Sequence, residues 1–284
     1  MPRPSRYFQR LAGKVAIVTG AGSQGEGFGT GKAIACVFAR EGARVALVDL
    51  DAERAELTRR LIADDGGDAF VCAADVTVPD GCRRVVTATL DHYGRLDVLV
   101  NNVGHGAGGG RLEALPDGLW QHVLDLNLKS VLLMTQQAIT HLVASRGNIV
   151  NIASTAGLRA HGGAAYGPSK AAVVALSREL AVMYGRDGVR ANTIAPGHLF
   201  TPLVEQFVDA AGRERRRRIA PLGIEGDAWD VAAAALFLAS DEARFISAVC
   251  LPVDGGVGAV AALAALEMIA AEDDAKAALT GDTP

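Results

Sequence analysis

Short apolar runs alternate with longer helical patterns along almost the whole chain, and this alternation constrains the fold more than any other feature. The apolar runs, short and mostly β-branched as in buried parallel strands, lie at 15–18, 45–48, 69–73, 96–100, 148–152, 189–194 and 249–253. Apolar residues recur at helical spacing over 32–40, 52–63, 85–93, 120–143, 166–184 and 229–239. Strands that alternate with helices predict an α/β fold, a doubly wound parallel sheet with helices on both faces.

The length of 284 residues is compatible with one domain or two, and the sequence favours one. A figure of about 150 residues per domain gives nearly two, but α/β domains of up to about 250 residues commonly fold as one unit. No Pro- or Ser-rich linker interrupts the alternation, and half of the residues are hydrophobic, enough for one large core. We therefore expect an N-terminal extension over 1–10, a single domain over 11–258 with an irregular lid region at about 198–226, and a helical tail over 259–284.

The charge and cysteine patterns exclude several classes of protein. Lys and Arg number 28 against 32 Asp and Glu, whereas a nucleic-acid-binding protein usually has a basic excess. No apolar run approaches the roughly 18–20 residues of a membrane span, and the N-terminus lacks the apolar segment of a secretory signal. The four cysteines form no C-x-x-C pair, which favours reduced thiols. We expect a cytoplasmic protein that binds a small molecule, with no nucleic-acid or membrane partner.

A glycine-rich segment, residues 20–31, separates the first expected strand from the first expected helix. There, backbone N–H groups at the helix N-terminus can bind a pyrophosphate, which glycine allows to approach closely. A mobile loop would have the same composition, but the strand–loop–helix context favours a nucleotide. Asp49 ends the second expected strand, where a carboxylate can bind both ribose hydroxyls of an adenosine and repel a 2′-phosphate. Since Leu50 follows instead of Arg or Lys, the sequence predicts NAD rather than NADP.

Further motifs follow in order, and together they resemble the short-chain dehydrogenase/reductase family over roughly residues 11–256. They are Asp75-Val76, the segment Asn101-Asn102-Val103-Gly104, Asn127 in a helix, Ser154 after a strand, Tyr166-Gly167-Pro168-Ser169-Lys170, and Pro196-Gly197 followed by Thr201. Each motif alone is weak, whereas all of them in this order are specific. The resemblance implies a Rossmann-like domain, a nicotinamide cofactor and hydride transfer between a secondary alcohol and a ketone.

The resemblance also implies which residues contact the cofactor. They are Gly20, Ser23, Thr30, Asp49, Asp75, Val76, Asn102, Gly104, Tyr166, Lys170, Pro196, Gly197, Leu199 and Thr201. One departure lies in the first loop, where about five extra residues, 24–28, interrupt the family's T-G-x-x-x-G-x-G pattern. Loop insertions cost little free energy, so we do not expect this one to abolish binding.

Tyr166 and Lys170 are four residues apart in an expected helix, so their side chains share one face. A phenol has a pKa of about 10, which an adjacent ammonium lowers. Tyr166 is therefore a candidate general base for alcohol oxidation and general acid for ketone reduction. Ser154 can hydrogen-bond the substrate oxygen. The resemblance assigns Lys170 to the nicotinamide ribose and Asn127 to a water that links Lys170 to solvent; the alternative, a helix pair without chemistry, is disfavoured by these neighbours.

Three of the six histidines fall near the expected site: His105, His161 and His198. They lack the spacing of metal ligands on one helix, so we expect them to line a pocket and we expect no metal. The candidate substrate-pocket residues are His105, His161, Phe200, Leu203 and Phe207. The aromatic and aliphatic members favour a hydrophobic alcohol or ketone.

Five arginines lie between Arg213 and Arg218, inside the expected lid region. A solvated helix face is the favoured interpretation. The functional alternative is capture of an anionic group, such as a carboxylate, a coenzyme A thioester or a carrier-protein arm.

The leading interpretation is an NAD-dependent dehydrogenase of secondary alcohols. A reductase of thioester-linked 3-oxoacyl groups comes second, because Asp49 disfavours the NADPH that biosynthetic reduction usually uses. An epimerase or dehydratase with the same Tyr–Lys element tends to have a longer chain. A non-catalytic NAD-binding sensor or scaffold is an alternative of another class, against which the set Asn127, Ser154, Tyr166 and Lys170 argues.

Two features predict self-association. The helical patterns at 120–143 and 166–184 carry more apolar residues than one sheet face needs, which favours a homo-oligomer, most simply a tetramer. The alanine-rich segment 259–279 predicts a helix with an apolar stripe at Val260, Leu263, Leu266 and Ile269. Its acidic residues, Glu267, Glu272, Asp273 and Asp274, are expected to face water. Our hypothesis is that this helix packs on a neighbouring subunit or covers its pocket; a frayed end is the alternative.

Overall fold

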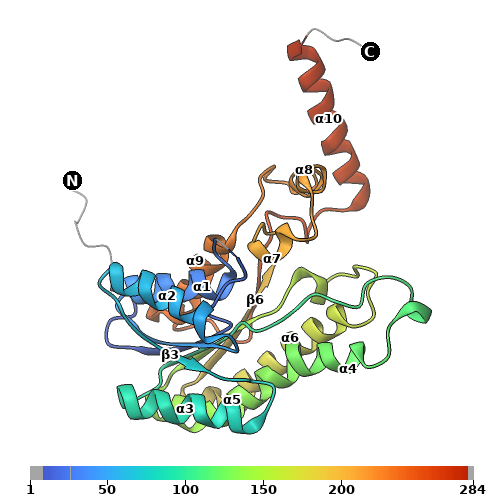
Figure 1. Ribbon diagram of the computed structural model, residues 1–284. Helices are drawn as coiled ribbons and strands as arrows, with labels where there is room; N and C mark the ends of the chain where they lie inside the picture. Colours follow the sequence, from blue (N-terminus) through green and yellow to red (C-terminus); the bar gives the residue numbers. More distant parts are fainter. Residues whose placement is uncertain (1–8, 26, 281–284) are drawn as a thin grey trace, which may run out of the picture.

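A parallel sheet forms the centre of the molecule in the computed structural model, which describes residues 9–25 and 27–280, with side chains up to residue 274 (Figure 1). Seven strands of the described chain pair in the order β3-β2-β1-β4-β5-β6-β7. They are β1 (Val15–Thr19), β2 (Arg44–Asp49), β3 (Asp68–Ala73), β4 (Val98–Asn101), β5 (Asn148–Ile152), β6 (Arg190–Pro196) and β7 (Cys250–Val253).

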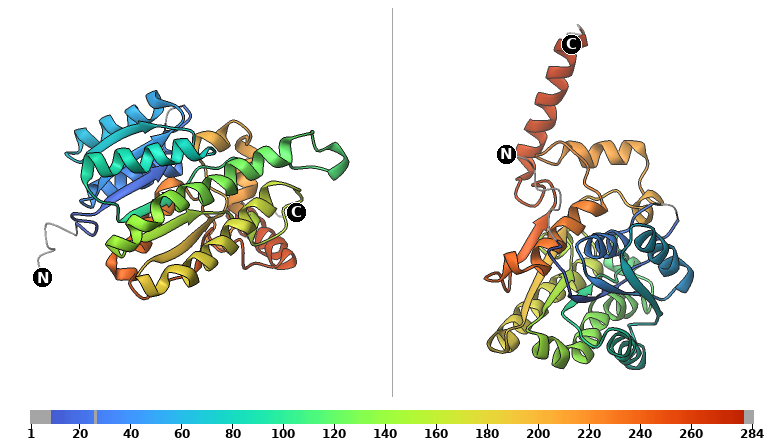
Figure 2. Two further views of the ribbon diagram at one scale, coloured as in Figure 1. Left: turned by 90° about the horizontal axis from the view of Figure 1, so that it is seen from below. Right: turned by 90° about the vertical axis from the view of Figure 1, so that its left-hand side faces the viewer.

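Helices cover both faces of this sheet (Figures 1 and 2). The α-helices of the described chain are α1 (Thr30–Arg40), α2 (Ala52–Asp64), α3 (Pro79–Tyr93), α4 (Leu119–Leu124), α5 (Ser130–Ser145), α6 (Tyr166–Tyr184), α7 (Pro202–Glu205), α8 (Ala210–Arg218), α9 (Ala228–Ala239) and α10 (Ala262–Thr280). Alternate residues of β1 enter opposite cores: Ala16 and Val18 pack with α1, α2 and α9, whereas Ile17 packs with α3, α5 and α6. The predicted doubly wound α/β fold is therefore confirmed.

The direction of winding reverses at β1. The strands β2 and β3 lie on one side of β1, and β4 to β7 lie on the other. Loops leaving the carboxyl ends of β1 and β4 therefore diverge, and the crevice between them is where open α/β sheets bind ligands.

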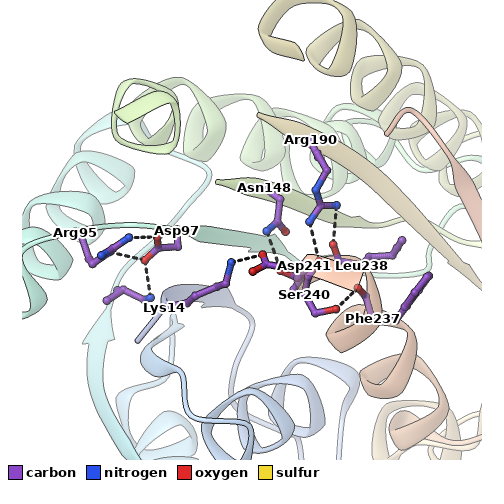
Figure 3. Close-up of polar contacts among 11 residues, drawn as sticks. Lys14, Arg95, Asp97, Asn148, Arg190, Phe237, Leu238, Ser240 and Asp241 are labelled. Carbon is purple, nitrogen blue, oxygen red and sulfur yellow. Dashed lines mark hydrogen bonds and ion pairs between the residues drawn. The ribbon is translucent and has the colours of Figure 1, made fainter. Parts of the chain in front are cut away.

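Polar contacts fasten the opposite, amino edge of the sheet (Figure 3). Arg190 donates hydrogen bonds to the carbonyl oxygens of Leu238 at 2.8 Å and Ser240 at 3.2 Å. Asn148 donates to the carbonyl oxygen of Ala239 at 3.0 Å. These side chains satisfy carbonyls at the C-terminal end of α9 that have no partner within the helix. The Arg190 and Asn148 side chains thus stabilise the amino edge by hydrogen bonds to the backbone.

Three expected elements differ in detail. The expected helix at 120–143 is two helices, α4 and α5, joined by a π-helical turn over Asp125–Lys129. The expected irregular region at 198–226 contains the helices α7 and α8. The expected tail helix is α10, which projects from the body beside α8 (Figure 1). Of the expected N-terminal extension, residues 1–8 lie outside the described chain. No described helix is long and apolar enough to span a membrane.

Candidate active site

A cleft of about 390 Å³ lies at the carboxyl ends of β1, β2 and β4, in the predicted crevice. The expected cofactor residues among its lining are Gly20, Ser23, Thr30, Asp49, Asp75, Val76, Asn102 and Gly104. Two residues expected in the substrate pocket line this cleft instead: Leu203 from α7, and His105 from the segment after β4.

The glycine-rich loop closes on itself despite its insertion. The Ser23 hydroxyl accepts a hydrogen bond from the Gly29 N–H at 3.1 Å, which closes the loop across the insertion. Phe28 packs on Trp229 of α9 with ring centroids 4.6 Å apart. Gln24 accepts a hydrogen bond from Gln206 at 3.2 Å, next to α7. The insertion therefore leaves the strand–loop–helix turn intact and links it to the segment 198–226.

The N-terminus of α1 faces the cleft without a side-chain cap. A Cβ atom at Gly31 would lie 2.0 Å from the carbonyl oxygen of Gly20, so only glycine allows this approach of helix and loop. Thr30 donates to Asn102 at 2.6 Å, and Asn102 in turn donates to the Gly20 carbonyl at 3.2 Å. The Thr30 and Asn102 side chains thus fix the loop, while backbone N–H groups of the first helical turn are left for an anion.

Asp49 lies at the end of β2 with its carboxylate held by the backbone. It accepts hydrogen bonds from the N–H groups of Gly22 at 2.9 Å and Asp51 at 3.0 Å. Leu50 beside it is 76% exposed. Arg54, which the sequence analysis missed, also lines this end of the cleft, where its guanidinium pairs with Asp51 at 3.0 Å. The signal for Arg54 was its position three residues after the helix-capping Asp51.

Asn127 lies in the π-helical turn and is fully buried. Its amide donates to the carbonyl oxygen of His105 at 3.1 Å and to the Ser169 hydroxyl at 3.0 Å, and it accepts from the His105 N–H at 2.8 Å. The additional residue of a π turn, often found at functional sites, shifts the register of the following helix. Ser169, one residue before Lys170, is a positioning contact that the sequence analysis did not single out.

Lys170 is buried beneath the cleft. Its ammonium donates to the carbonyl oxygen of Ile152 at 2.9 Å. A Cβ atom at Gly104 would lie 2.7 Å from the Lys170 nitrogen, so glycine at this position leaves room for the ammonium. Burial lowers the pKa of Lys170 to about 8. The site thus holds a cation whose proton is easily lost near neutral pH.

The Tyr166 and Ser154 side chains lie close enough to interact: burial raises the pKa of Tyr166, and the contact with Ser154 opposes that rise. The Lys170 nitrogen lies 5.9 Å from the centre of the Tyr166 ring. Ser154 also accepts the N–H of Ala156 at 3.1 Å, which orients its hydroxyl. The four expected catalytic residues, Asn127, Ser154, Tyr166 and Lys170, are therefore brought together.

A second cavity, of about 730 Å³, lies beside Tyr166 and is bordered by His161 and the loop 156–163. Two other expected pocket residues lie elsewhere. Phe207 is 73% exposed, and Phe200 packs beneath the Arg213 guanidinium, which is 3.5 Å from its ring centre. Of the expected pocket residues, His161 is the one that borders this cavity.

The end of β6 continues into the remaining expected cofactor residues. A Cβ atom at Gly197 would lie 2.5 Å from the Cβ atom of Asp254, so the turn after Pro196 requires glycine. Leu199 is buried, and Thr201 precedes α7.

Arg213, Arg217 and Arg218 of the arginine run pair with acidic residues, whereas Arg213 and Arg215 remain exposed, so the favoured interpretation as a solvated helix face holds only in part. Arg213 pairs with Glu225 at 2.7 Å, and Arg217 pairs with Glu272 of α10 at 2.5 Å. The prediction that the acidic residues of the tail face water holds for Asp273, whose side chain is 58% exposed although it pairs with Arg218 at 2.6 Å, whereas Glu272 is partly buried. Charges far apart in sequence meet here, which periodicity within one helix cannot reveal.

Comparison with known proteins agrees with the fold and the motifs. A family profile described as "Enoyl-(Acyl carrier protein) reductase" matches residues 26–258. The 2,5-dichloro-2,5-cyclohexadiene-1,4-diol dehydrogenase of Sphingobium indicum is 39% identical over 249 residues, which cover 87% of this chain and 97% of that protein.

Solved structures agree as well. Levodione reductase superposes with a TM-score of 0.84 at 32% identity, over 88% of this chain and 100% of that one. The 7α-hydroxysteroid dehydrogenase complexed with NADH and 7-oxo glycochenodeoxycholic acid gives 0.82 at 32% identity, over 87% and 95%. Because the profile and these relatives span most of the chain, the protein belongs to the short-chain dehydrogenase/reductase family, oxidoreductases that act on CH–OH groups with a nicotinamide cofactor.

Proposed function

We propose that this protein is an NAD-dependent dehydrogenase that interconverts a secondary alcohol and a ketone. The observation that carries the proposal is the placement of Ser154 and Tyr166 together with the buried Lys170, next to the cleft at the ends of β1, β2 and β4 and to a second cavity beside Tyr166. A non-catalytic sensor would need the cleft but not this buried, costly ammonium.

The residues of the cleft suit NAD. Backbone N–H groups at the start of α1 would receive its pyrophosphate, Asp49 its adenosine ribose hydroxyls, and Asp75 and Val76 its adenine. Lys170 would bind the nicotinamide ribose, and the turn at Pro196-Gly197 with Leu199 and Thr201 would hold the carboxamide. Bound NAD supplies a hydride acceptor and a positive charge near Tyr166.

The proton chemistry belongs to the chain itself. Ser154 donates a hydrogen bond to the substrate oxygen and holds it near the Tyr166 oxygen, which takes the alcohol proton as a phenolate in oxidation and returns it as a phenol in reduction. Lys170 stabilises the phenolate, and its own pKa, lowered to about 8 by burial, suits onward proton transfer. Asn127 holds the His105 backbone beside Lys170, and we assign to it the water that links Lys170 to solvent.

The preference for NAD rests on Asp49. Its carboxylate lies where a 2′-phosphate would sit, and like charges there repel. Arg54 lines this end of the cleft, and its guanidinium is already paired with Asp51. A 2′-phosphate would therefore be repelled by the Asp49 carboxylate, while the Arg54 guanidinium is already paired with Asp51.

Reduction of a thioester-linked acyl group is the second candidate, because the matching family profile is described as an acyl carrier protein reductase. An acidic carrier would need free surface arginines. Arg213, Arg217 and Arg218 are paired with acidic residues of the chain itself, which weakens this candidate.

Self-association is part of the proposal. Leu132 of α5 and Val182 and Met183 of α6 are exposed by 49%, 78% and 59%. A tetramer would bury such apolar residues. Leu263 and Leu266 of α10, exposed by 68% and 64%, could pack on a neighbour in the same assembly. Light scattering that gives a monomer of about 29.4 kDa would contradict this part.

The test of function is a panel of cyclic and aryl secondary alcohols, with NAD or NADP, followed by the absorbance of the reduced nicotinamide. We expect oxidation of at least one alcohol with NAD. No oxidation with either cofactor, combined with unmeasurable NADH binding, would contradict the proposed function.

A further inference from the structure

The arginine run of α8 divides into groups with different partners. Arg213 pairs with Glu225, and Arg217 and Arg218 pair with α10. Arg215 is exposed. Arg216 is the member that turns inward, where it lines a third cavity of about 470 Å³ between α8 and the end of β7.

Arg216 has no partner for its charge in the described part of the chain. Its Nη1 atom is buried without a hydrogen bond, and no described carboxylate forms an ion pair with it. Burial lowers the pKa of Arg216, and attraction from Glu225 opposes this only in part. Because a guanidinium stays charged in proteins, burial without a partner is unfavourable unless an anion joins it.

His198 presents a second unpaired nitrogen in the same cavity. Its Nδ1 atom is buried without a hydrogen-bond partner, and it directly follows the Gly197 turn at the catalytic end of β6. Burial, Arg216 and His161 all lower its pKa, with burial the largest cause. Because His198 directly follows Gly197, the Arg216 cavity lies next to the turn that we assign to the nicotinamide carboxamide.

Three carboxylates lie near the same cavity, and each accepts at least one hydrogen bond from another group. Asp254 accepts the N–H groups of Gly256 and Gly258 at 2.9 and 2.8 Å. Asp230 accepts the N–H of Asp227 at 2.8 Å. Glu225 binds Arg213 through one oxygen, while its other oxygen is buried without a partner. These charges leave Arg216 unsatisfied, but they would repel a dianion such as a phosphate more strongly than a monoanion.

The remaining lining is apolar. The unpaired nitrogens of Arg216 and His198 share the cavity with the apolar side chains of Leu199, Leu222, Ile224, Leu251 and Val253. A ligand of this cavity therefore needs a hydrocarbon body and one anionic end.

We infer that Arg216, assisted by His198, binds the carboxylate of the substrate, so that the substrate class is a hydrophobic secondary alcohol or ketone that carries a carboxylate distant from its reacting carbon. The planar guanidinium matches a carboxylate in a two-point hydrogen bond. This inference rests on the proposed function for the reaction, but the binding of the anion can be measured without turnover.

The experiment compares 4-(1-hydroxyethyl)benzoate with its methyl ester as substrates of the wild-type enzyme, Arg216→Gln and Arg215→Gln. The last is the matched control, since it removes the neighbouring, exposed arginine of the same helix. We expect the acid to have the lower KM in the wild type. Arg216→Gln should raise the KM of the acid by about 10- to 100-fold and leave the ester unchanged, because only the acid loses a charge-assisted hydrogen bond. Arg215→Gln should change neither, and Arg216→Lys should restore part of the difference.

A binding measurement separates failure of this inference from failure of the proposed function. Calorimetry on the enzyme–NAD complex with 4-acetylbenzoate should show binding that Arg216→Gln weakens by a similar factor, whether or not the alcohol is oxidised. Equal KM values for acid and ester, an equal effect of Arg216→Gln on both, or binding of 4-acetylbenzoate that is absent or insensitive to Arg216, would each overturn the inference. Oxidation of the ester alone would leave the proposed function standing.

Discussion

Arg190 and Arg216 are partly buried guanidinium groups at opposite edges of the same sheet, and their surroundings differ. At the amino edge, Arg190 donates to the carbonyl oxygens of Leu238 and Ser240 (Figure 3). At the carboxyl edge, Arg216 has a buried nitrogen without a partner. Burial is the largest cause of a lowered pKa at both residues. Burial of a charge therefore does not distinguish a structural from a functional group here; the presence or absence of a partner does.

Lys170 extends the comparison at the carboxyl edge. It makes one hydrogen bond, to the Ile152 carbonyl, although an ammonium can donate three. At the amino edge, Arg190 donates its hydrogen bonds to backbone carbonyl oxygens. At the carboxyl edge, Lys170 and Arg216 keep N–H groups without a partner, which lowers stability, as is common at functional sites.

Substitution of Lys170 should produce the largest effect that separates the two edges. Lys170→Met should lower turnover at least about 100-fold, because Tyr166 loses the ammonium that stabilises its phenolate. The same variant without cofactor should be more stable by about 1–2 kcal/mol at pH 7, since the gain from removing a buried charge exceeds the lost hydrogen bond. Activity assays and denaturant titrations measure both.

The stability difference between Lys170→Met and the wild type should depend on pH. Burial holds the pKa of Lys170 at about 8 in the folded protein, below its ordinary value of 10.5, so the unfolded chain binds the proton more tightly. The destabilisation is complete below pH 8 and is relieved as the pH rises toward 10.5. The stability advantage of Lys170→Met should shrink over that window. Lys129→Met, at an exposed lysine of the π turn, is the control; a variant at Lys170 that is less stable at pH 7 would break the comparison.

Removal of the amino-edge arginine should do the opposite. Arg190→Met leaves carbonyl groups at the end of α9 without their donor, which should lower the free energy of unfolding by about 2–4 kcal/mol. KM and turnover per folded molecule should stay unchanged, as measured by activity normalised to folded protein. A raised KM without loss of stability would mean that this edge is not purely structural.

Asp49→Ala tests the cofactor end of the carboxyl edge. Loss of the carboxylate removes the repulsion of a 2′-phosphate, so the ratio of kcat/KM for NAD over NADP should fall by about tenfold or more. Asp64→Ala, at the far end of α2, is the matched control and should leave the ratio unchanged. A wild-type enzyme that already prefers NADP would contradict the assignment.

The ion pairs between α8 and α10 should matter least. Arg218→Gln removes the pair with Asp273 and a hydrogen bond to the Ile269 carbonyl, and surface pairs contribute about 0–1 kcal/mol each. We expect a Tm lower by a few degrees at low salt and no difference at high salt. A loss of assembly in scattering experiments would instead assign α10 a role in the oligomer.

The sequence predicted the parts of the molecule that depend on local patterns. The strands and most helices were correct, and α6 was predicted from Tyr166 to Tyr184 as observed, because burial on a sheet leaves a clear apolar period. The motif residues Asn127, Ser154, Tyr166 and Lys170 converge because parallel strands end at the same edge.

What the sequence could not predict depends on contacts between distant segments. The π turn at Asn127 adds one residue without altering the apolar pattern. The bond from Gly29 to Ser23 that closes the loop, and the pairing of Arg218 with Asp273, join residues whose local sequence carries no sign of the partner. That Arg216 has a buried nitrogen without a partner could be predicted only by knowing which neighbouring charged groups are already paired.

The most direct test of the central claim, that Tyr166 transfers the proton at this site, is the variant Tyr166→Phe, which removes only the hydroxyl. The measurement is kcat on an accepted secondary alcohol together with the Kd of NADH from its fluorescence. We predict a kcat lower by about 10²–10⁴-fold with a Kd for NADH within about twofold of the wild-type value. Unchanged turnover on every accepted substrate would contradict the account.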